Sequence, residues 1–341
     1  MVGFMSGNGN NDRKITINDI AEDLGISTTT VSRSISGKGR ISEDTRRRVL
    51  EYIEEHKYKP NQLAKGLASS KTYNIGWIVP GDSTMTALPF FDQCMAGVAE
   101  KASENDYDIL ISLIFGDDLS GVERIIENSK VDGFILARTV TDDPCVKLLK
   151  KSGIPFVVVG STSEKDVIQI DNDHVNACKE FTCKLVDNGL RDFAYISGSS
   201  HHIVNLSRRQ GFAEGVKKID PKLSKSLIYM DCDDETAIDS AVEDAVRKGA
   251  KSMVCSDDYI CFRALFKLDQ LGLKIPDDIK VASFYNSMLL DRSEPSISVI
   301  QYDPALLGRV ACEVLLSLIG GMEAANRLIT DYDILLKGST D

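Results

Sequence analysis

The sequence ITINDIAEDLGISTTTVSR, residues 15–33, determines how the first part of the chain folds. Apolar residues recur along it at i, i+3, i+4 and i+7 between Ile17 and Leu24, which predicts a helix with one buried face. Gly25 can adopt the left-handed conformation that ends a helix, and Ser27 is placed to cap a second one. The stretch therefore predicts two short helices joined by a tight turn.

The second helix is expected to have two different faces. Val31 and Ile35 lie four residues apart and should pack inward. At roughly 100° per residue, Thr29 and Arg33 project from the opposite face. A small helix that packs on its neighbour and presents hydroxyl and guanidinium groups outward is typical of a helix-turn-helix that reads the DNA major groove.

Charge is divided unevenly along the chain. Residues 13–71 hold 12 Lys or Arg and 8 Asp or Glu, whereas residues 72–341 hold 28 and 42. The first part is thus basic although the whole chain has a formal net charge of −11. This asymmetry is expected where one end of a protein meets DNA phosphates and the rest stays clear of them. A small helical segment that is basic by chance is the plainer interpretation.

A third helix is predicted after Ser42, which is placed to cap it. Val49, Leu50 and Ile53 are expected to bury against the first two helices. Acidic residues in its first turn suit the helix dipole.

A short hinge segment is predicted next. Pro60 ends the third helix, and Asn61 can cap residues 62–69. Gly66 within the segment costs roughly 1 kcal/mol of helix stability relative to Ala. The segment is also shorter than the roughly 12–15 residues at which an isolated helix becomes marginal. We expect it to be frayed unless a partner binds it.

From residue 74 on, short β-rich apolar runs alternate with helical stretches. Ten such runs lie at residues 75–79, 107–114, 131–137, 154–160, 167–170, 193–197, 226–230, 251–255, 279–284 and 297–301. This alternation predicts a parallel, doubly wound α/β sheet, and ten strands indicate two lobes of five or six strands each. The predicted fold class is α/β, with a small all-α head and a two-lobed body.

Cysteine usage and apolar runs indicate the compartment. The eight cysteines include no CxxC pair, which suggests buried thiols in a reducing environment. His174 and Cys178 lie four residues apart with Cys183 nearby, but a metal site needs further ligands at matching spacing. No signal sequence and no apolar run of about 20 residues is found. We expect a cytoplasmic protein that uses no metal, cofactor or membrane.

Eight segments carry a resemblance to a known family. They are TINDIAEDLGISTTTVSR (16–33), GKGRISEDTRRRVLEYIEE (37–55), YKPNQLAKGLASSKTYNIGWIVP (58–80), PFF (89–91), VDGFILA (131–137), GIPFVVVG (153–160), SRRQGF (207–212) and LGLKIPDDIKVASF (271–284). In these segments the chain resembles the LacI/GalR (lactose-repressor) family of bacterial transcription regulators. The resemblance implies a DNA-binding repressor whose body has the periplasmic-binding-protein fold and closes on a small effector.

The resemblance also implies a division of the chain. We expect a disordered arm at 1–13, a helix-turn-helix domain at 14–58, a hinge at 59–73, and an effector-binding and dimerisation domain at 74–341. Its first lobe is expected at about 74–165 plus 297–322, and its second at about 166–296 plus 323–341. A homodimer is expected because a palindromic operator pairs with two-fold protein symmetry. No heptad repeat that would make a tetramer follows the last apolar run.

The DNA-binding residues are carried over from the family pattern. Thr28 and Thr29 look like base-reading positions, and Arg33 can bind guanine through two hydrogen bonds. Leu67 resembles the hinge leucine that family members wedge into the minor groove. The expected set is Thr16, Asn18, Thr28, Thr29, Thr30, Ser32, Arg33, Lys38, Arg40, Asn61, Leu67 and Ala68.

The effector site is expected beyond the carboxyl ends of the strands, where ligands bind in such sheets. Arg208 stands three residues before Gly211-Phe212, where the family places an arginine that grips the ligand. Phe90 can stack on a sugar face or pack in the core. The expected set is Asp82, Ser83, Phe90, Phe91, Arg138, Ser161, His202, Arg208, Asp257 and Tyr285.

Two positions depart from the family pattern. Many members have Asn-Asp where this chain has Asp257-Asp258, and Gly-Phe-Asp-Asp where it has Ser-Phe-Tyr-Asn at 283–286. Tyr285 thus replaces a sugar-binding aspartate, which favours a glycoside or another polyol, with Asp257 as a source of the missing carboxylate. A partner protein, as in catabolite-control members, is the alternative effector.

Solute-binding proteins and enzymes are the two other classes of protein that the sequence must be compared with. A transport-type solute-binding protein explains the body but not residues 13–71. An enzyme finds little support, because the chain contains no GxSxG, HExxH or GxxxxGK[ST] motif and no GxGxxG that opens a helix after a strand. We therefore expect no catalytic residue. Binding of a palindromic duplex separates the regulator from both alternatives.

Overall fold

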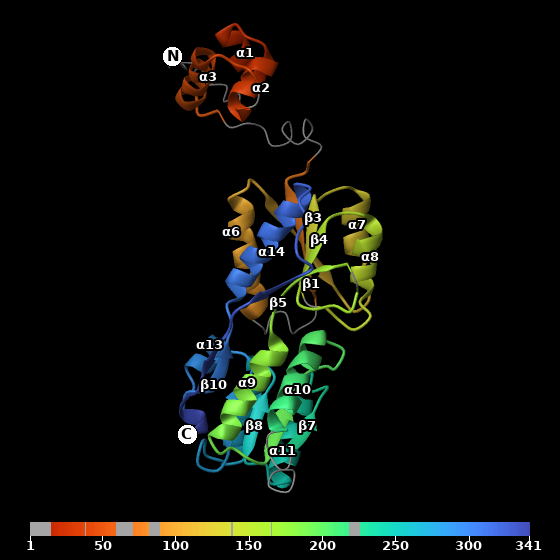
Figure 1. Cartoon of the computed structure of the whole chain (residues 1–341), viewed down its shortest axis with the longest axis vertical. Helices are drawn as coiled ribbons and strands as arrows, with labels where there is room; N and C mark the ends of the chain where they lie inside the picture. The colour runs from red at the N-terminus through yellow and green to blue at the C-terminus, as the bar shows by residue number, and fades with distance from the viewer. Residues whose placement is uncertain are drawn as a thin grey trace, which may run out of the picture. The chain divides into compact units, whose positions relative to one another are not determined.

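A computed structural model describes residues 15–37, 39–58, 71–81, 89–137, 139–164, 166–217 and 226–341. The chain divides into two compact units, Met1–Thr72 and Tyr73–Asp341, which we call the head and the body. The head contains α1 (Ile17–Leu24), α2 (Thr28–Ser36) and α3 (Glu43–Glu55), as Figure 1 shows. The hinge, predicted at residues 59–73, lies largely outside the described residues.

The head is held together by a small apolar core. Ile20, Val31 and Val49 are fully buried, one from each helix, and Ala21 is 7% exposed. The prediction that Leu50 is buried was wrong, because its side chain is 45% exposed. Leu50 follows Val49 directly and is therefore turned about 100° away from the buried face of α3.

The body contains two six-stranded sheets. The first has the strand order β11-β5-β4-β3-β1-β2 and the second β12-β10-β9-β8-β6-β7. All neighbouring strands run parallel except β10 and β12, which are antiparallel. The strands are β1 Asn74–Pro80, β2 Asp108–Ile114, β3 Gly133–Ala137, β4 Phe156–Val159, β5 Ile168–Asn172, β6 Phe193–Ile196, β7 Ser226–Tyr229, β8 Ser252–Cys255, β9 Lys280–Ser283, β10 Ser298–Gln301, β11 Arg327–Thr330 and β12 Asp333–Leu335.

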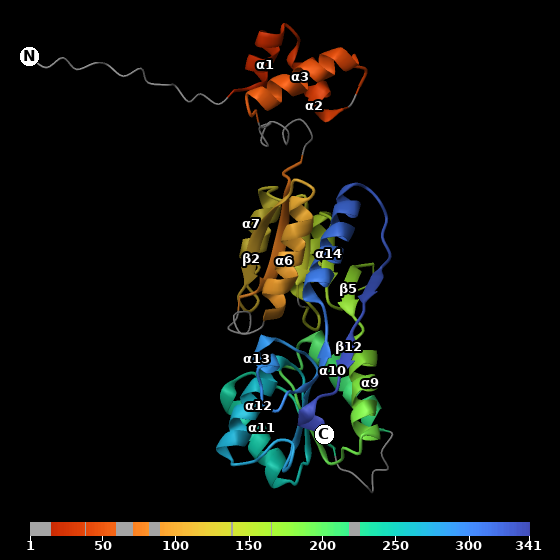
Figure 2. The same ribbon diagram turned by 90° about the vertical axis from the view of Figure 1, so that its left-hand side faces the viewer.

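Helices cover both faces of each sheet, which is the doubly wound arrangement. On the first sheet α6 and α14 lie side by side on one face, with α7 and α8 on the other (Figures 1 and 2). On the second sheet α9 and α10 cover one face, and α11 and α12 the other. The helices are α6 Pro89–Ser103, α7 Ser120–Glu127, α8 Pro144–Ser152, α9 His174–Asp187, α10 Ile203–Val216, α11 Glu235–Arg247, α12 Asp258–Gln270, α13 Met288–Asp291 and α14 Pro304–Ile319, followed by the 3₁₀ turn η1 Gly338–Thr340.

The contact between α6 and α14 depends on two glycines. A Cβ atom on Gly308 would lie 1.9 Å from the Cys94 carbonyl oxygen, and one on Gly97 would lie 1.9 Å from the Ala305 carbonyl oxygen. Each glycine thus lets the backbone of the other helix approach directly. The close approach brings Leu307, at the start of α14, to the edge of the interlobe cleft described below.

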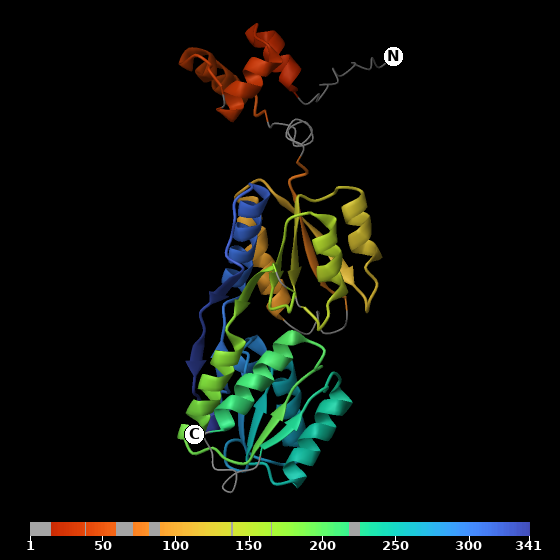
Figure 3. The same ribbon diagram turned by 45° about the vertical axis from the view of Figure 1, so that its right-hand side comes forward.

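All ten strands predicted from the sequence are present, but the predicted lobe limits were wrong at three strands. β5 and β11 belong to the first sheet and β10 to the second. The chain therefore crosses between the lobes after each of these strands. Figure 3 shows the C-terminal strands β11 and β12 passing from one lobe to the other beside the β5–α9 connection. Strand patterning alone does not specify which of two similar sheets a strand joins.

Candidate DNA-binding surface and effector cleft

The turn between α1 and α2 forms as its residues predict. Gly25 has φ 65° and ends α1, and its N–H donates to the carbonyl groups of Ala21 and Glu22. The Ser27 hydroxyl accepts a hydrogen bond from the Thr30 N–H at 3.1 Å and so caps α2. These local bonds fix the start of α2, from which the predicted base-reading residues project.

The outward face of α2 carries the predicted DNA-binding side chains. Thr28, Thr29, Ser32 and Arg33 are all exposed, whereas Val31 on the opposite face is fully buried. The stem of Arg33 passes the following loop closely, because a Cβ atom on Gly39 would lie 3.2 Å from its Cδ. The helix therefore presents hydroxyl groups and one guanidinium on a single accessible surface.

Two of the predicted DNA contacts already take part in helix capping. The Thr16 hydroxyl donates to the Asp19 carboxylate at 2.7 Å in a capping box at the start of α1. The Thr30 and Ser27 hydroxyls are 2.9 Å apart, and Thr30 is only half-exposed. These hydroxyls are therefore less available to phosphate than those of Thr28 and Ser32.

The remaining predicted DNA contacts fall into two groups. Asn18 and Arg40 are exposed on the head. The predicted contacts that lie outside the described residues are Lys38, Asn61, Leu67 and Ala68.

A cleft of about 830 Å³, open solvent included, lies between the two lobes of the body. The first lobe contributes residues at the carboxyl ends of β3, β4 and β5, and the second contributes the start of α9, one face of α10 and the ends of β8 and β9. The lining residues are Phe90, Phe91, Thr139, Val159, Gly160, Ser161, Asp171, Asn172, His174, Val204, Asn205, Ser207, Arg208, Asp257, Asp258, Tyr285 and Leu307.

The structure brings most of the predicted effector-site residues into this cleft. Six of them line it: Phe90, Phe91, Ser161, Arg208, Asp257 and Tyr285. The predicted residues Asp82, Ser83 and Arg138 lie outside the described residues.

Arg208 is held in the cleft by the packing of its helix. A Cβ atom on Gly211 would lie 2.4 Å from the Val175 carbonyl oxygen, so α10 packs directly on α9 at this position. Phe212 is fully buried and stacks on Tyr195, with ring centroids 4.9 Å apart. The sequence Arg-Arg-Gln-Gly-Phe thus combines a close helix contact, a core anchor and a cationic side chain that faces the cleft.

The Arg208 guanidinium has unused hydrogen-bonding capacity. The side chain is 8% exposed, and one terminal nitrogen donates to the Ser256 carbonyl at 2.9 Å. Its Nε makes no hydrogen bond within the described part of the chain. The guanidinium carbon lies 5.9 Å from the Tyr285 ring centroid, in the range of a cation–π contact. A ligand oxygen would complete its hydrogen bonding.

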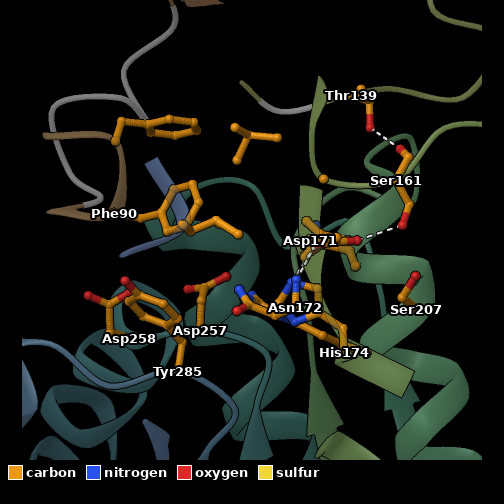
Figure 4. A pocket seen from close by; sticks show the side chains of 17 residues that line it. Phe90, Thr139, Ser161, Asp171, Asn172, His174, Ser207, Asp257, Asp258 and Tyr285 are labelled. Carbon is orange, nitrogen blue, oxygen red and sulfur yellow. Dashed lines mark hydrogen bonds and ion pairs between the residues drawn. The ribbon is translucent and has the colours of Figure 1, made fainter. Parts of the chain in front are cut away.

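Aromatic residues form one side of the cleft, as Figure 4 shows. Phe90 packs edge-on against Phe91 and Tyr285, with ring centroids 5.3 and 6.2 Å away. Phe90 therefore both packs with its neighbours and borders the cleft, so the two interpretations offered by the sequence are compatible. Burial raises the pKa of the Tyr285 hydroxyl, which stays protonated at neutral pH.

A polar cluster that sequence analysis missed lies on the opposite side. Ser161 donates to Asp171, whose other oxygen accepts the Asn172 N–H at 2.8 Å. His174 Nε2 lies 3.5 Å from Asp171 Oδ1. Burial raises the pKa of Asp171 and holds that of His174 well below its ordinary value, so His174 is neutral at pH 7. The only sequence signal was the position of this segment directly after the predicted strand 167–170.

The two neighbouring aspartates at the start of α12 differ in their bonding. Asp257 caps the helix, since its carboxylate accepts the Ile260 N–H at 2.9 Å and the Ser256 hydroxyl at 3.1 Å. Asp258 is fully buried, and neither of its carboxylate oxygens makes a hydrogen bond within the described residues. Asp257 was predicted as the source of a ligand-binding carboxylate, and both of its carboxylate oxygens already accept hydrogen bonds. Asp258 also lines the cleft but was not among the predicted residues.

His202 does not line the cleft. Its backbone pairs with Val140 as an isolated antiparallel bridge, and the Thr141 N–H donates to the His201 carbonyl at 2.9 Å. The Thr141 hydroxyl is also 3.0 Å from His201 Nδ1. His202 instead borders a second cavity with Pro80 and Asp143. Because its backbone pairs with Val140, His202 belongs to a contact that joins the two lobes rather than to the cleft wall.

Comparison with known proteins identifies the family. Residues 16–61 match the model for bacterial regulatory proteins of the lacI family, and residues 183–340 match that for a periplasmic binding protein-like domain. The HTH-type transcriptional regulator MalR of Staphylococcus xylosus is 31% identical over 319 residues, which cover 92% of this chain and 94% of MalR. The chain belongs to the LacI family. The predicted resemblance and fold class are thereby confirmed.

Solved structures share the fold of this LacI-family regulator. The complex of the transcriptional regulator CelR with cellobiose has a TM-score of 0.70 at 24% identity, over 96% of this chain and all of that one. The lac repressor dimer bound to operator and the anti-inducer ONPF has a TM-score of 0.79 at 20% identity, over 96% and 99%. At these identities the likeness concerns the fold alone.

Membership defines the general activity of this LacI-family regulator. The family consists of DNA-binding transcriptional regulators rather than enzymes, and this chain is one of them. Within the described residues, every helix is too short or too polar to cross a bilayer. The same residues contain no group of three or more His, Cys, Asp or Glu side chains placed to hold a metal ion.

Proposed function

We propose that the protein is a repressor that binds a palindromic operator as a homodimer and is controlled by a small carbohydrate or polyol in the interlobe cleft. The observation that carries the effector assignment is Arg208, a buried guanidinium that lines the cleft beside Tyr285 and whose Nε has no hydrogen-bond partner among the described residues. Buried donors of this kind are costly unless a partner satisfies them. A ligand with several oxygens supplies that partner.

DNA reading is proposed for the exposed face of α2. Arg33 can bind guanine through two hydrogen bonds, whereas Thr28 and Thr29 contribute hydroxyl and methyl contacts that discriminate less sharply. Each of these side chains is exposed in the head. The basic charge of residues 13–71 supports phosphate binding around this face.

Dimerisation is proposed through exposed apolar side chains of the body. Phe262 and Phe266, one turn apart on α12, are 48% and 49% exposed. Ile111 on the edge strand β2 is 53% exposed, and Phe115, the first residue after that strand, is 61% exposed. Large apolar side chains gathered on one surface mark interfaces more often than solvated faces. Sedimentation of the full chain should give the mass of two copies, and a mass of one or four would overturn this part.

The same proposal covers the division of the chain and its location. It places a disordered arm at 1–13, the DNA-binding domain at 14–58, a hinge at 59–73 and the effector-binding domain at 74–341. The protein is proposed to act in the cytoplasm, where its operator DNA is. Limited proteolysis should cut first within 59–73 and release a body that still dimerises.

The test uses the full chain and DNA selected from randomised duplexes. We expect a palindromic site, an affinity that falls steeply with salt, and a change in affinity when cellobiose or maltose is added. Selection of a single half-site would overturn the dimeric mode. Operator binding that no sugar alters, but that a partner protein alters, would replace the carbohydrate effector by the catabolite-control alternative.

A further inference from the structure

Asp258 is a buried acid that lines the cleft. It is the first residue of α12, its exposed fraction is 0%, and both of its carboxylate oxygens lack hydrogen bonds within the described residues. Its position at a helix N-terminus offsets part of the cost of burying a charge. The rest of that cost depends on the groups around the carboxylate.

The groups around Asp258 remove only part of the cost of burying its charge. Burial and the neighbouring Asp257 raise the pKa of Asp258 to about 6, and the Ser287 hydroxyl and Arg208 oppose this shift only in part. Figure 4 shows Asp258 beside the Tyr285 ring, at the same end of the cleft as Asp257. At neutral pH the cleft thus contains a carboxylate that neither the Ser287 hydroxyl nor Arg208 fully stabilises.

The charge of the cleft lining limits what can bind there. Among the described lining residues Asp171, Asp257 and Asp258 are acidic, and Arg208 is the only cation because burial keeps His174 neutral. A second negative charge brought in by a ligand would meet this excess of carboxylates in a water-poor site. Hydroxyl groups, by contrast, donate to carboxylates without adding charge.

We propose that Asp258 binds the hydroxyl groups of the effector directly and that the effector is an uncharged glycoside rather than a sugar phosphate or a sugar acid. This inference rests on the proposed function, in which the cleft holds a carbohydrate effector. Asp258 replaces Asp257 in the role that sequence analysis assigned, because Asp257 is committed to the cap of α12. A group that is unfavourable in the empty protein and satisfied by the ligand is typical of binding sites.

The main experiment measures melting of the full chain with four named probes. Cellobiose and maltose represent neutral glycosides, and glucose 6-phosphate and glucuronate represent anionic sugars. We expect at least one neutral probe to raise the melting temperature by mass action and neither anionic probe to do so. A larger shift with an anionic probe would overturn the inference while leaving the carbohydrate-controlled regulator intact.

The variant Asp258→Asn tests the residue itself. It should weaken binding of the active neutral probe by about tenfold or more, because an amide is a poorer acceptor than a carboxylate. Without ligand it should melt higher than the wild type near pH 8 and lose that advantage near pH 5, since the wild-type carboxyl is then protonated and no longer charged. Unchanged probe binding in a folded variant would overturn the inference.

A matched control keeps the two effects apart. Asp234→Asn makes the same change at the cap of α11, where the carboxylate accepts the Ala237 N–H at 2.8 Å. Asn caps helices about as well as Asp, so this variant should leave both melting and probe binding unchanged. If no probe shifts the wild type while operator binding persists, the carbohydrate effector and this inference fall together. Loss of operator binding alone would count only against the proposed function.

Discussion

In the head, the side chains assigned to function are exposed, whereas in the body they are buried. Thr28, Thr29 and Arg33 extend from a helix held by a small apolar core. Arg208 and Asp258 are 8% and 0% exposed, within a unit whose four apolar clusters surround two sheets. The head can therefore change its functional residues at little cost in stability. The body cannot change its functional residues so freely, because a buried polar group without a hydrogen-bond partner lowers the stability of the fold.

The first way to test this comparison is to disturb body packing far from any functional group. Gly308→Ala would place a methyl group 1.9 Å from the Cys94 carbonyl oxygen, so α6 and α14 must move apart. We expect a loss of about 3 kcal/mol in the free energy of unfolding, measured in urea. Gly121→Ala is the control, because its nearest neighbour is the Ser112 hydroxyl at 3.2 Å. Equal effects would show that the helix contact is not tightly packed.

The second test removes an exposed functional side chain from the head. Arg33→Ala should lower affinity for the selected operator by about 10- to 100-fold, which corresponds to roughly 1–3 kcal/mol for a guanine contact. The melting temperature should hardly change, because Arg33 is exposed. Arg47→Ala on α3 is the control, since its guanidinium is paired with Asp44 at 2.6 Å. If both variants lost affinity equally on all sequences, Arg33 would bind phosphate rather than a base.

The third test uses pH to probe buried groups in the body. His174 has a pKa well below that of the unfolded chain, so the unfolded state binds more protons below about pH 6.5 and stability falls as pH decreases. The slope should approach roughly 1.4 kcal/mol per pH unit. Asp171 and Asp258 have raised pKa values and act in the opposite direction. His174→Gln should remove only the histidine part.

The measurement is therefore the free energy of unfolding of the wild type minus that of His174→Gln, followed between pH 7 and pH 5. A wild type that loses stability relative to the variant toward acid pH supports a buried neutral histidine. A wild type that instead gains stability relative to the variant toward acid pH would mean that His174 is protonated in the folded protein, in an ion pair with Asp171.

The fourth and smallest effect concerns the cap of the recognition helix. Ser27→Ala removes the hydroxyl that accepts the Thr30 N–H at 3.1 Å and should cost about 1 kcal/mol. In a head with so small a core, this is a measurable fraction of its stability, detectable as an earlier helical transition by circular dichroism. Ser27→Asp, which also caps, should restore it. A head that melts unchanged in Ser27→Ala would show that tertiary packing, not the cap, fixes the turn.

Structure that depends on local sequence signals was predicted correctly in both the head and the body. Helix periodicity, Gly25 and Ser27 act over a few residues, and the structure confirms all three. The ten apolar runs that predicted strands are also local signals, and each forms a strand. The short strands β11 and β12 were missed because three or four residues carry too weak a pattern.

Several residues of the cleft could not be predicted from local sequence signals. Arg208 was predicted because the short segment that ends in Gly211-Phe212 resembles the family pattern, in which an arginine at this position grips the ligand. Asp171 and His174 were missed because they reach the cleft only when β5 joins the first sheet and the chain then crosses to α9. His202 was misplaced because its position relative to the cleft depends on the start of α10.

By itself, the sequence determined the two helices around Gly25, the outward residues of α2, the alternation of strands and helices, and the family. These follow from periodicity, caps and motif order, which are written in neighbouring residues. Only the tertiary structure decided which sheet each crossing strand joins and which of two neighbouring acids caps a helix. Asp257 and Asp258 are adjacent and chemically identical, yet Asp257 caps α12, whereas the Asp258 carboxylate is fully buried and makes no hydrogen bond that the geometry of the described residues defines. Burial and hydrogen-bond geometry, which depend on residues far apart in the chain, make that difference.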